Sequence, residues 1–490
     1  MDSGKKLMVS ILLAVMFLTP LLAACRPAGT PTPTEFPKPT SAPQSTAAPA
    51  PFNWRKYEGT EIKIFLNKHP YSESLVATLP KFTEKTGITV KYEMLSEGEY
   101  FDKLRLELAA GTGLYDSFMT NQIMIWEYTP AGWLEALDPY MADSTKTDVE
   151  FYKSDDIFPA LLAANKWNME IGGGIGEGNL WAIPTMVETY ILGYRADLFE
   201  KYNLKPPETL PEMYEAAVTL TKGEGGNFRG VIEPGFRGGN IVWSGFPSTM
   251  MSYAKTKYPD FDIVDGKLKS VFNQPELVSA TDLWVKMIRD AGPLGWTSID
   301  WYDVRELFGS GAYGMFQECD FFAASFEDAQ KSKVAGKVKY VPCVSSPGGT
   351  HQSNMATWGL GMSSNSKKKD AAWYFIQWAT SPEALLIATR DFSNYNPTRK
   401  SVWEHPDIVA TMGKWGQGTY MEAVLANLNQ YARIGFTPES EVFTLLDLWS
   451  LGLQSIWTKE KSAQQALDDV AREMDNAIEK AGVKPGIIRK

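Results

Sequence analysis

The side chains best suited to metal binding or nucleophilic chemistry are scarce in this chain, which has three cysteines and three histidines among its 490 residues. His69, His351 and His405 lie far apart in the sequence, and no Cys or His pair has the spacing of a zinc site. The chain also lacks the G-x-S-x-G and H-E-x-x-H patterns of hydrolases. We therefore expect no catalytic residue, no metal site and no cofactor.

Cys25 is the thiol whose neighbours indicate a modification. Lys5 and Lys6 precede an apolar run over residues 7–18, and small residues stand directly before the cysteine. This order resembles a bacterial lipoprotein signal, in which residues 1–24 are removed and a diacylglycerol is attached to the Cys25 sulfur. The apolar run is shorter than the roughly 20 residues of a membrane-spanning helix. The resemblance predicts an exported protein, anchored by lipid to the outer face of the cytoplasmic membrane, at the cell surface or in the periplasm.

Cys319 and Cys343 remain once Cys25 is lipidated. Export would place them in an oxidising setting, where a disulfide bond is chemically favourable. The bond requires their Cα atoms to approach within about 7 Å, and the sequence leaves this open.

Composition divides the chain into a tether and a body. Residues 25–53 are rich in Pro, Thr and Ala, and they offer too little apolar surface to offset the entropy of ordering, so we expect an extended tether. The body from residue 54 exceeds the size at which a single hydrophobic core usually stops growing, which predicts two lobes. We assign residues 54–180 mainly to the first lobe and residues 181–490 to the second, with the chain crossing back to the first.

Charge argues against some classes of partner. The net charge of -10 arises from 48 basic and 58 acidic residues, and the basic residues form no cluster along the chain. We therefore expect neither a nucleic acid nor an anionic lipid surface as the partner of the body.

The first part of the body alternates between strand and helix patterns. Strands are predicted over residues 61–66, 88–92 and 114–119, with a helix that ends before Gly87 and another between Ser96 and Gly111. Strands that alternate with helices imply an α/β fold with a largely parallel sheet, covered by helices on both faces.

The later part of the chain is dominated by helix signals. Helices are expected to begin near Ser366, Ser381 and Ser462, and the last of them to end at Gly482. Residues 261–268 read as a hairpin whose Asp-Gly pair supplies the two positive φ angles of a type I′ turn.

Several segments, in this order, resemble the extracellular solute-binding proteins of family 1, the carbohydrate-binding lipoproteins of bacterial ABC importers. They are residues 81–88 (KFTEKTGI), 109–116 (AAGTGLYD), 131–138 (AGWLEALD), 181–199 (from WAIP to YRADLF), 206–210 (PPETL), 308–315 (FGSGAYGM) and 370–384 (from DAAWYFI to TSPEA). Residues 237–246 and 272–276 are similar to members that take sugars or sugar alcohols. Each segment is weak alone, but together they span nearly the whole body.

The resemblance implies both a fold and a function. The fold would be of the two-lobed periplasmic-binding-protein type II kind, in which a hinge joins two lobes that are each a mainly parallel sheet flanked by helices. The protein would be the substrate-binding component of an ABC importer. As a monomer it would capture a sugar, oligosaccharide or sugar alcohol in the cleft between the lobes, and a membrane permease would receive the ligand unchanged.

Candidate ligand-binding residues follow from their positions in these segments and from the rule that clefts of α/β proteins lie at strand ends. A polyhydroxylated ligand has an apolar C–H face and an edge of hydroxyl groups, so its site requires aromatic rings and paired donors and acceptors. The polar candidates are Asn67, Asp116, Asn121, Gln122, Glu188, Tyr190, Arg237, Gln317, Glu318, Asp320 and Asn394. The candidate stacking rings are Trp126, Trp243, Trp358 and Tyr395.

Other functions remain open at this level. A lipid-anchored carbohydrate-cleaving hydrolase needs two carboxylates about 5 to 9.5 Å apart, and a single sequence does not exclude such a pair. A structural surface protein would favour repeats of fixed period, which the sequence does not contain. Among binding proteins, peptide, polyamine or metal ligands are the alternatives to a carbohydrate.

Overall fold

The structure, a computed structural model, describes residues 51–237 and 240–488. Contacts between Cα atoms gather residues 50–490 into one compact unit. The predicted signal peptide, Cys25 and most of the predicted tether lie outside the described residues. Within the described part of the chain, every helix is either too short or too polar to cross a membrane.

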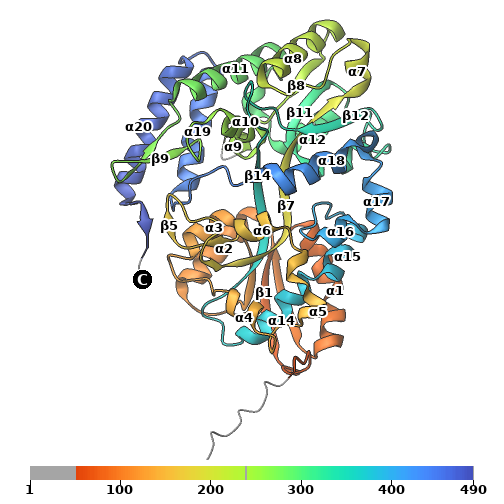
Figure 1. Cartoon of the computed structure of the whole chain (residues 1–490), viewed down its shortest axis with the longest axis vertical. Helices are drawn as coiled ribbons and strands as arrows, with labels where there is room; N and C mark the ends of the chain where they lie inside the picture. Colours follow the sequence, from red (N-terminus) through yellow and green to blue (C-terminus); the bar gives the residue numbers. More distant parts are fainter. Residues whose placement is uncertain (1–50, 238–239, 489–490) are drawn as a thin grey trace, which may run out of the picture. The chain divides into compact units, whose positions relative to one another are not determined.

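A nine-stranded mixed sheet forms the framework of the body, and its main path is β2-β1-β3-β13-β7-β11-β8 (Figure 1). β12 pairs with β7, and β14 pairs with β13. In chain order the strands are β1 (Glu61–Asn67), β2 (Thr89–Leu95), β3 (Ser117–Asn121), β7 (Ala182–Arg195), β8 (Arg229–Ile232), β11 (Tyr313–Cys319), β12 (Val338–Pro342), β13 (Ser353–Met362) and β14 (Ala432–Arg433).

The longest strand, β7, belongs to both ends of this sheet. Its residues 182–189 pair with β13, whereas residues 190–195 pair with β11 on one edge and with β12 on the other. We call β1, β2, β3 and β13, with the helices packed on them, the first lobe, and β8, β11 and β12 with their helices the second lobe. Figure 1 shows β7 running from one lobe into the other.

The first lobe is built as the sequence predicts, with shifted strand boundaries. β1 pairs in parallel with β2 and with β3. The helix between β1 and β2, α1 (Pro70–Thr86), ends at Gly87, whose φ of 71° is the left-handed conformation that glycine adopts most easily. The next helix, α2 (Glu97–Ala110), ends at Gly111 in the same way, with φ of 65°. β3 begins at Ser117 rather than near residue 114, which matters for the site.

The sheet is mixed rather than mainly parallel. β13 runs antiparallel to both β3 and β7, and β7 runs antiparallel to β11 and β12. The chain enters the second lobe through β7 and returns through β13, so the two strands cross in opposite directions. The strands away from this crossing, β1 with β2 and β8 with β11, keep the parallel pairing expected of α/β units.

Helices and short strands cover the sheet. Those that precede β7 are α3 (Gln122–Tyr128), α4 (Asp138–Ala142), α5 (Val149–Tyr152), α6 (Pro159–Ala164), β4 (Lys166–Trp167), β5 (Glu170–Ile171) and β6 (Asn179–Leu180). Between β7 and β13 lie α7 (Ala196–Lys201), α8 (Leu210–Glu224), α9 (Asn240–Trp243), α10 (Gly245–Tyr253), β9 (Phe261–Val264), β10 (Lys267–Ser270), α11 (Pro275–Ala291), α12 (Trp301–Gly309) and α13 (Ala323–Glu327).

After β13 the chain first returns to the first lobe and then crosses again. α14 (Lys369–Ala379) and α15 (Pro382–Phe392) pack near α1, where Phe82 meets Phe375 with ring centroids 5.6 Å apart. The remaining elements are α16 (Lys400–Trp403), α17 (Pro406–Met412), α18 (Thr419–Ala426), α19 (Val442–Trp457), α20 (Ala463–Ala481) and β15 (Gly486–Ile487). Ser381 and Ser462 cap α15 and α20 as predicted, whereas the helix expected near Ser366 begins at Lys369. The predicted hairpin forms as β9 and β10, with positive φ at both turn residues.

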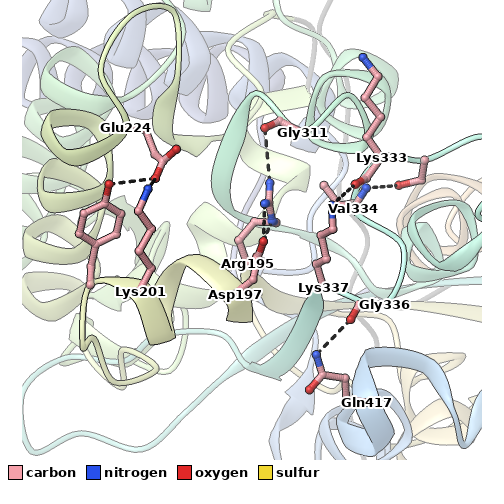
Figure 2. A network of polar contacts seen from close by, with 12 residues as sticks. Arg195, Asp197, Lys201, Glu224, Gly311, Lys333, Val334, Gly336, Lys337 and Gln417 are labelled. Carbon is pink, nitrogen blue, oxygen red and sulfur yellow. Dashed lines mark hydrogen bonds and ion pairs between the residues drawn. The ribbon is translucent and has the colours of Figure 1, made fainter.

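A network of polar contacts fixes the second-lobe end of β7 (Figure 2). The Arg195 guanidinium donates from Nε and Nη2 to the two carboxylate oxygens of Asp197, at 2.7 and 2.6 Å. Its Nη1 donates to the carbonyl oxygen of Gly311, which follows α12. Nearby, Lys201 of α7 pairs with Glu224 at the end of α8, at 2.6 Å. These contacts join β7, α7, α8 and the start of β11, and so they hold the crossing strand firmly in the second lobe.

Cys319 and Cys343 are free and buried. Cys319 ends β11 and Cys343 follows β12, and these two strands pair with opposite edges of β7. Both cysteines pack with Tyr190 in one buried cluster, with their thiols unbonded. The disulfide that the sequence left open is therefore not formed in this structure.

Candidate functional site

A cavity of about 410 Å³ opens where the two lobes meet. This volume is within the usual range for a small-molecule site, about 300–1,000 Å³. From the first lobe, the crossing strand β7 and the segment after α15, the cavity is lined by Asn67, Lys68, His69, Pro70, Phe101, Asn121, Gln122, Met186, Glu188, Tyr190, Ala356, Trp358, Ser393, Asn394 and Asn396. From the second lobe it is lined by Trp243, Trp301, Tyr302, Arg305, Glu318, Cys319, Phe321 and Phe443.

Nine of the fifteen candidate residues predicted from the sequence line this cavity. They are Asn67, Asn121, Gln122, Glu188, Tyr190, Trp243, Glu318, Trp358 and Asn394. They come from β1, the β3–α3 junction, β7, α9, β11, β13 and the segment after α15, so the fold brings together residues that are up to 327 positions apart, from 67 to 394.

Asn67 and Asn394 present unpaired amide atoms to the cavity wall. Asn67 is the last residue of β1, and its buried Oδ1 has no hydrogen-bond partner among the described residues. Asn394 follows Ser393, which ends α15 with a φ of 64°, and neither Oδ1 nor Nδ2 of Asn394 has a partner. A buried polar atom without a partner costs free energy, about 1–3 kcal/mol, so these atoms are well suited to pair with a ligand.

Asn121 and Gln122 have side chains that the protein itself uses. Asn121 Oδ1 caps α3 by accepting from the backbone N–H groups of Ile123 and Met124. Gln122 Oε1 accepts from the backbone N–H of Thr357, and its Nε2 donates to the carbonyl oxygen of Met355. These bonds fix the position of β13 beside α3, so both residues shape the wall of the cavity.

The crossing strands contribute the acidic side of the cavity. Glu188 and Tyr190 lie two residues apart on β7, and so on the same face of it. Glu188 Oε2 lies 3.9 Å from the Cys319 sulfur, which is next to Glu318. Burial, with a further contribution from the charge of Glu188, raises the pKa of Glu318 to about 8. Glu318 is therefore largely protonated at neutral pH.

Aromatic rings from both lobes face the cavity. Trp358 of β13 stacks on Phe101 of α2, with centroids 6.0 Å apart and planes inclined by 11°. In the second lobe, Trp301 of α12 stacks on Phe322 with planes inclined by 13°. Trp243 of α9 packs edge-on against Phe436, which fixes its orientation. Rings held in this way offer flat apolar faces to the C–H groups of a ligand.

Three basic residues stand at the cavity wall. His69 caps α1 by accepting at Nδ1 from the backbone N–H of Tyr71, and burial lowers its pKa to about 4. It is therefore neutral at physiological pH. Arg305 of α12 donates from Nε and Nη2 to Glu306, at 3.0 and 2.8 Å. Lys68 is exposed.

Three of the predicted residues serve the framework of the body instead of the cavity. Asp116 precedes β3, and its carboxylate accepts from the Lys63 backbone N–H and from the Ser366 hydroxyl at the edge of the sheet opposite the cavity. Trp126 is buried in α3 with 1% of its surface exposed. Tyr395 packs edge-on against Trp415 with centroids 4.9 Å apart.

The other three predicted residues outside the cavity belong to the second lobe. The Arg237 side chain is exposed and pairs with Asp447 at 3.1 Å. Gln317 points to the face of β11 away from Glu318, where Nε2 donates to Gly245 and Thr249 and Oε1 accepts from the Val344 backbone N–H. Asp320, fully buried, lies directly behind the cavity.

Asp320 joins β7 to the segment that follows α15. Its Oδ2 accepts from the Thr189 hydroxyl of β7 at 2.7 Å, and its Oδ1 accepts from Nδ2 of Asn396 at 2.6 Å. Asn427, at the end of α18, donates to the same Thr189 hydroxyl and to the Tyr190 carbonyl oxygen. Burial raises the pKa of Asp320 to about 7. This carboxyl group thus organises the crossing rather than the cavity surface.

Sequence reasoning missed several residues of the cavity wall. Lys68 and His69 directly follow Asn67, and Asn396 lies two residues after Asn394, so the neighbours of the chosen strand ends would have found them. Phe101, Trp301, Tyr302, Arg305, Phe321 and Phe443 lie on helices or after a strand end and carry no local signal. Among the described residues, no group of three or more His, Cys, Asp or Glu side chains is arranged to hold a metal ion.

Comparison with known proteins agrees with this arrangement. The erythritol/L-threitol-binding protein of Mycolicibacterium smegmatis is 31% identical over 415 residues, covering 84% of this chain and 85% of that protein. The mannitol-binding protein of Pseudomonas aeruginosa is 26% identical over 328 residues, covering 66% of this chain and 70% of that protein.

Solved structures show the same fold. An ABC transporter solute-binding protein from Agrobacterium radiobacter K84, in complex with ribitol, superimposes with a TM-score of 0.70 at 22% sequence identity, covering 86% of this chain and 99% of that one. The predicted two-lobed fold of the periplasmic-binding-protein type II kind is confirmed. The profile of bacterial extracellular solute-binding proteins matches residues 68–385, more than half of the chain. This chain belongs to the family of bacterial extracellular solute-binding proteins.

Proposed function

We propose that this protein captures a sugar alcohol in the cavity between its lobes and delivers it, chemically unchanged, to the membrane permease of an ABC importer. One observation carries the proposal: the cavity is lined by stacked aromatic rings and by residues whose buried polar atoms lack partners among the described residues. These atoms are Asn67 Oδ1, both amide atoms of Asn394 and Glu318 Oε2. Hydroxyl groups donate and accept hydrogen bonds, so a polyol satisfies both kinds of atom.

The relatives support this class of ligand. The similar proteins from M. smegmatis and P. aeruginosa are named for erythritol, L-threitol and mannitol, and the superimposed structure contains ribitol. These ligands are open-chain molecules with a hydroxyl group on every carbon. We infer the same chemistry for this cavity of about 410 Å³, because amide groups, carboxyl groups and aromatic rings all line it.

Closure of the lobes is the proposed mechanism. β7 passes from the first lobe into the second, β13 pairs beside it, and residues of both lobes line the cavity. A ligand that contacts both walls binds the closed form more tightly than the open form, and so shifts the population toward closure. The permease would recognise the closed shape.

The anchorage and the oligomeric state belong to the same proposal. We infer a lipidated Cys25 that holds a monomeric body outside the cytoplasmic membrane. Incorporation of radiolabelled palmitate into the expressed full chain, with its loss in the Cys25→Ser variant, would test the anchor. Light scattering of the lipid-free body would test the monomer, because a dimer doubles the scattering mass.

A thermal-shift screen tests the ligand class. Residues 51–490 would be heated with erythritol, L-threitol, ribitol or D-mannitol, and with glucose and maltose for comparison. A ligand at 100 times its dissociation constant stabilises the folded state by about 2.7 kcal/mol, which is a shift of several degrees at most. Stabilisation by at least one polyol supports the proposal, whereas stabilisation by glucose or maltose alone, or by none of these compounds, contradicts it. Chromatography of the polyol after prolonged incubation tests catalysis, and any product would contradict a binding role.

A further inference from the structure

Glu318 occupies an unusual place at the base of the cavity. It lies near the end of β11 with 2% of its surface exposed, and it lines the cavity. Its Oε1 accepts a hydrogen bond from the backbone N–H of Cys319 at 3.1 Å. Its buried Oε2 has no hydrogen-bond partner among the described residues. One oxygen is thus held by the protein, and the other is left for a ligand.

A second carboxyl group lies behind it. Glu233 directly follows β8, which pairs in parallel with β11, so the carboxyl ends of the two strands meet at the same edge of the sheet. Glu233 is completely buried, and neither of its carboxyl oxygens has a hydrogen-bond partner among the described residues. Two ionised carboxylates buried at this edge, with no cation among the groups that shift their pKa values, would be two uncompensated charges, which an apolar interior strongly disfavours.

Burial and the nearby charge of Glu188 disfavour the charged form of Glu318, and they outweigh the hydrogen bonds from Cys319, which favour it. Burial raises the pKa of Glu233 and of Glu318, and the two groups repel each other when both are ionised. Burial also raises the pKa values of the Tyr190 phenol on β7, of the Cys319 and Cys343 thiols at the ends of β11 and β12, and of the Asp320 carboxyl. The other ionisable groups of the cavity are Glu188, Tyr302 and Arg305 of α12, and Lys68 and His69 before α1.

We propose that Glu318 binds the ligand as a neutral carboxylic acid that donates a hydrogen bond from Oε2 to a ligand hydroxyl oxygen. This inference rests on the proposed function for the identity of the ligand. The acid keeps its proton throughout, so nothing is transferred. Oε2 supplies a donor that an ionised carboxylate lacks, whereas Asn67 Oδ1 on the opposite wall is an acceptor. The two residues therefore require a ligand with both an acceptor and a donor, as a chain of hydroxyl groups provides.

The pH dependence of binding distinguishes a neutral acid from a carboxylate. The dissociation constant of the polyol that gives the largest thermal shift would be measured by isothermal titration calorimetry between pH 6 and pH 9.5. We expect constant affinity up to about pH 8, and then a loss of affinity of about tenfold per pH unit.

The Glu318→Gln variant keeps a neutral donor. It should therefore bind the polyol within about threefold of the unmodified protein at pH 7, and its affinity should not fall at high pH. An affinity that rises with pH, or a loss of more than 30-fold in a folded Glu318→Gln variant at pH 7, would overturn the inference.

A matched control and a readout without ligand complete the test. The Glu404→Gln variant changes an exposed acid outside the cavity, and it should reproduce both the affinity and the pH profile of the unmodified protein. Infrared difference spectra between the unmodified protein and Glu318→Gln at pH 7 should contain the C=O band of a protonated carboxyl group. A carboxylate band instead would refute the neutral acid whether or not a polyol binds. A protonated band without binding of any polyol would refute the proposed function and leave the protonation of Glu318 established.

Discussion

Phe101 of α2 and Trp358 of β13 stack with their ring centroids 6.0 Å apart and their planes inclined by 11°. The two residues come from distant parts of the chain, and both line the cavity. Trp358 is held on its strand between β3 and β7, while Phe101 fixes the orientation of the indole ring. The pair forms a preoriented apolar wall in the first lobe, opposite Trp243 and Trp301 of the second.

The Phe101→Leu variant tests this wall. Leucine keeps most of the apolar volume but removes the stacked ring, and aromatic pairs contribute about 0.5–1.5 kcal/mol beyond their buried area. We expect polyol affinity, measured by calorimetry, to fall between about twofold and tenfold. The Phe151→Leu variant changes a partly buried ring that packs on Trp54 outside the cavity, and it should leave affinity unchanged. Equal losses in both variants would show that the effect is not local to the cavity.

Asn394 should matter for binding and not for folding. Neither of its amide atoms has a partner among the described residues, so the Asn394→Ala variant removes no hydrogen bond of the free protein. We expect its melting temperature without ligand to be unchanged or higher. Two lost ligand hydrogen bonds, at about 0.5–1.5 kcal/mol each, should weaken polyol binding by about 5-fold to 150-fold.

An exposed amide provides the comparison for Asn394. Asn429 donates to the Leu425 carbonyl oxygen on the surface and does not line the cavity. The Asn429→Ala variant should therefore bind as the unmodified protein does. Unchanged affinity in Asn394→Ala would remove this residue from the site.

Asp320 should make stability depend on pH. Its pKa of about 7 in the folded protein lies above the value of about 3.9 in an unfolded chain, so the folded state holds the proton more tightly. The stabilisation is fully present below about pH 4 and is lost as the pH rises to about 7. Relative to the Asp320→Asn variant, which does not titrate, the free energy of unfolding should fall by at most about 4 kcal/mol over this window.

Urea unfolding at pH 4.5 and pH 8 measures this difference for Asp320. The amide of Asp320→Asn can still accept from Asn396, so the variant should fold. A difference in unfolding free energy that does not change with pH would show that Asp320 titrates normally in the folded protein.

The two cysteines of the body should remain reduced. Both are free and buried in this structure, Cys319 beside Tyr190 and Cys343 just after the strand that ends opposite Ile191. Residues 51–490 would be purified without reductant. In denaturant, two thiols per chain should then react with Ellman's reagent. In the native protein the reaction should be slow, because burial raises the pKa of both thiols. A protein that shows no thiol in denaturant would contain the disulfide and would contradict the free thiols of this structure.

Local signals in the sequence located most elements of the fold. Gly87, Gly111 and Gly482 end helices with positive φ, and Ser381 and Ser462 begin them, because caps depend on only a few neighbouring residues. The antiparallel crossing of β7 and β13 was not predicted. It depends on pairing between residues more than 150 positions apart, such as Met355 with Thr189, which no local pattern encodes.

The candidate site was predicted best where a residue follows a strand end. Asn67, Asn121 and Gln122 were placed by that rule, and they line the cavity. Asp116 was chosen by the same rule, but it precedes β3 and so lies at the opposite end of this strand from Asn121. Trp301 and Phe101 come from helices, whose approach to the cavity depends on how the two lobes pack.

Isothermal titration calorimetry of residues 51–490 at pH 7 with erythritol, L-threitol, ribitol and D-mannitol tests the central claim most directly. The account predicts saturable binding of at least one of these polyols at one site per chain, weakened by Asn394→Ala, with the polyol recovered unaltered. Absence of binding by all four, or conversion of the polyol during the titration, would contradict it.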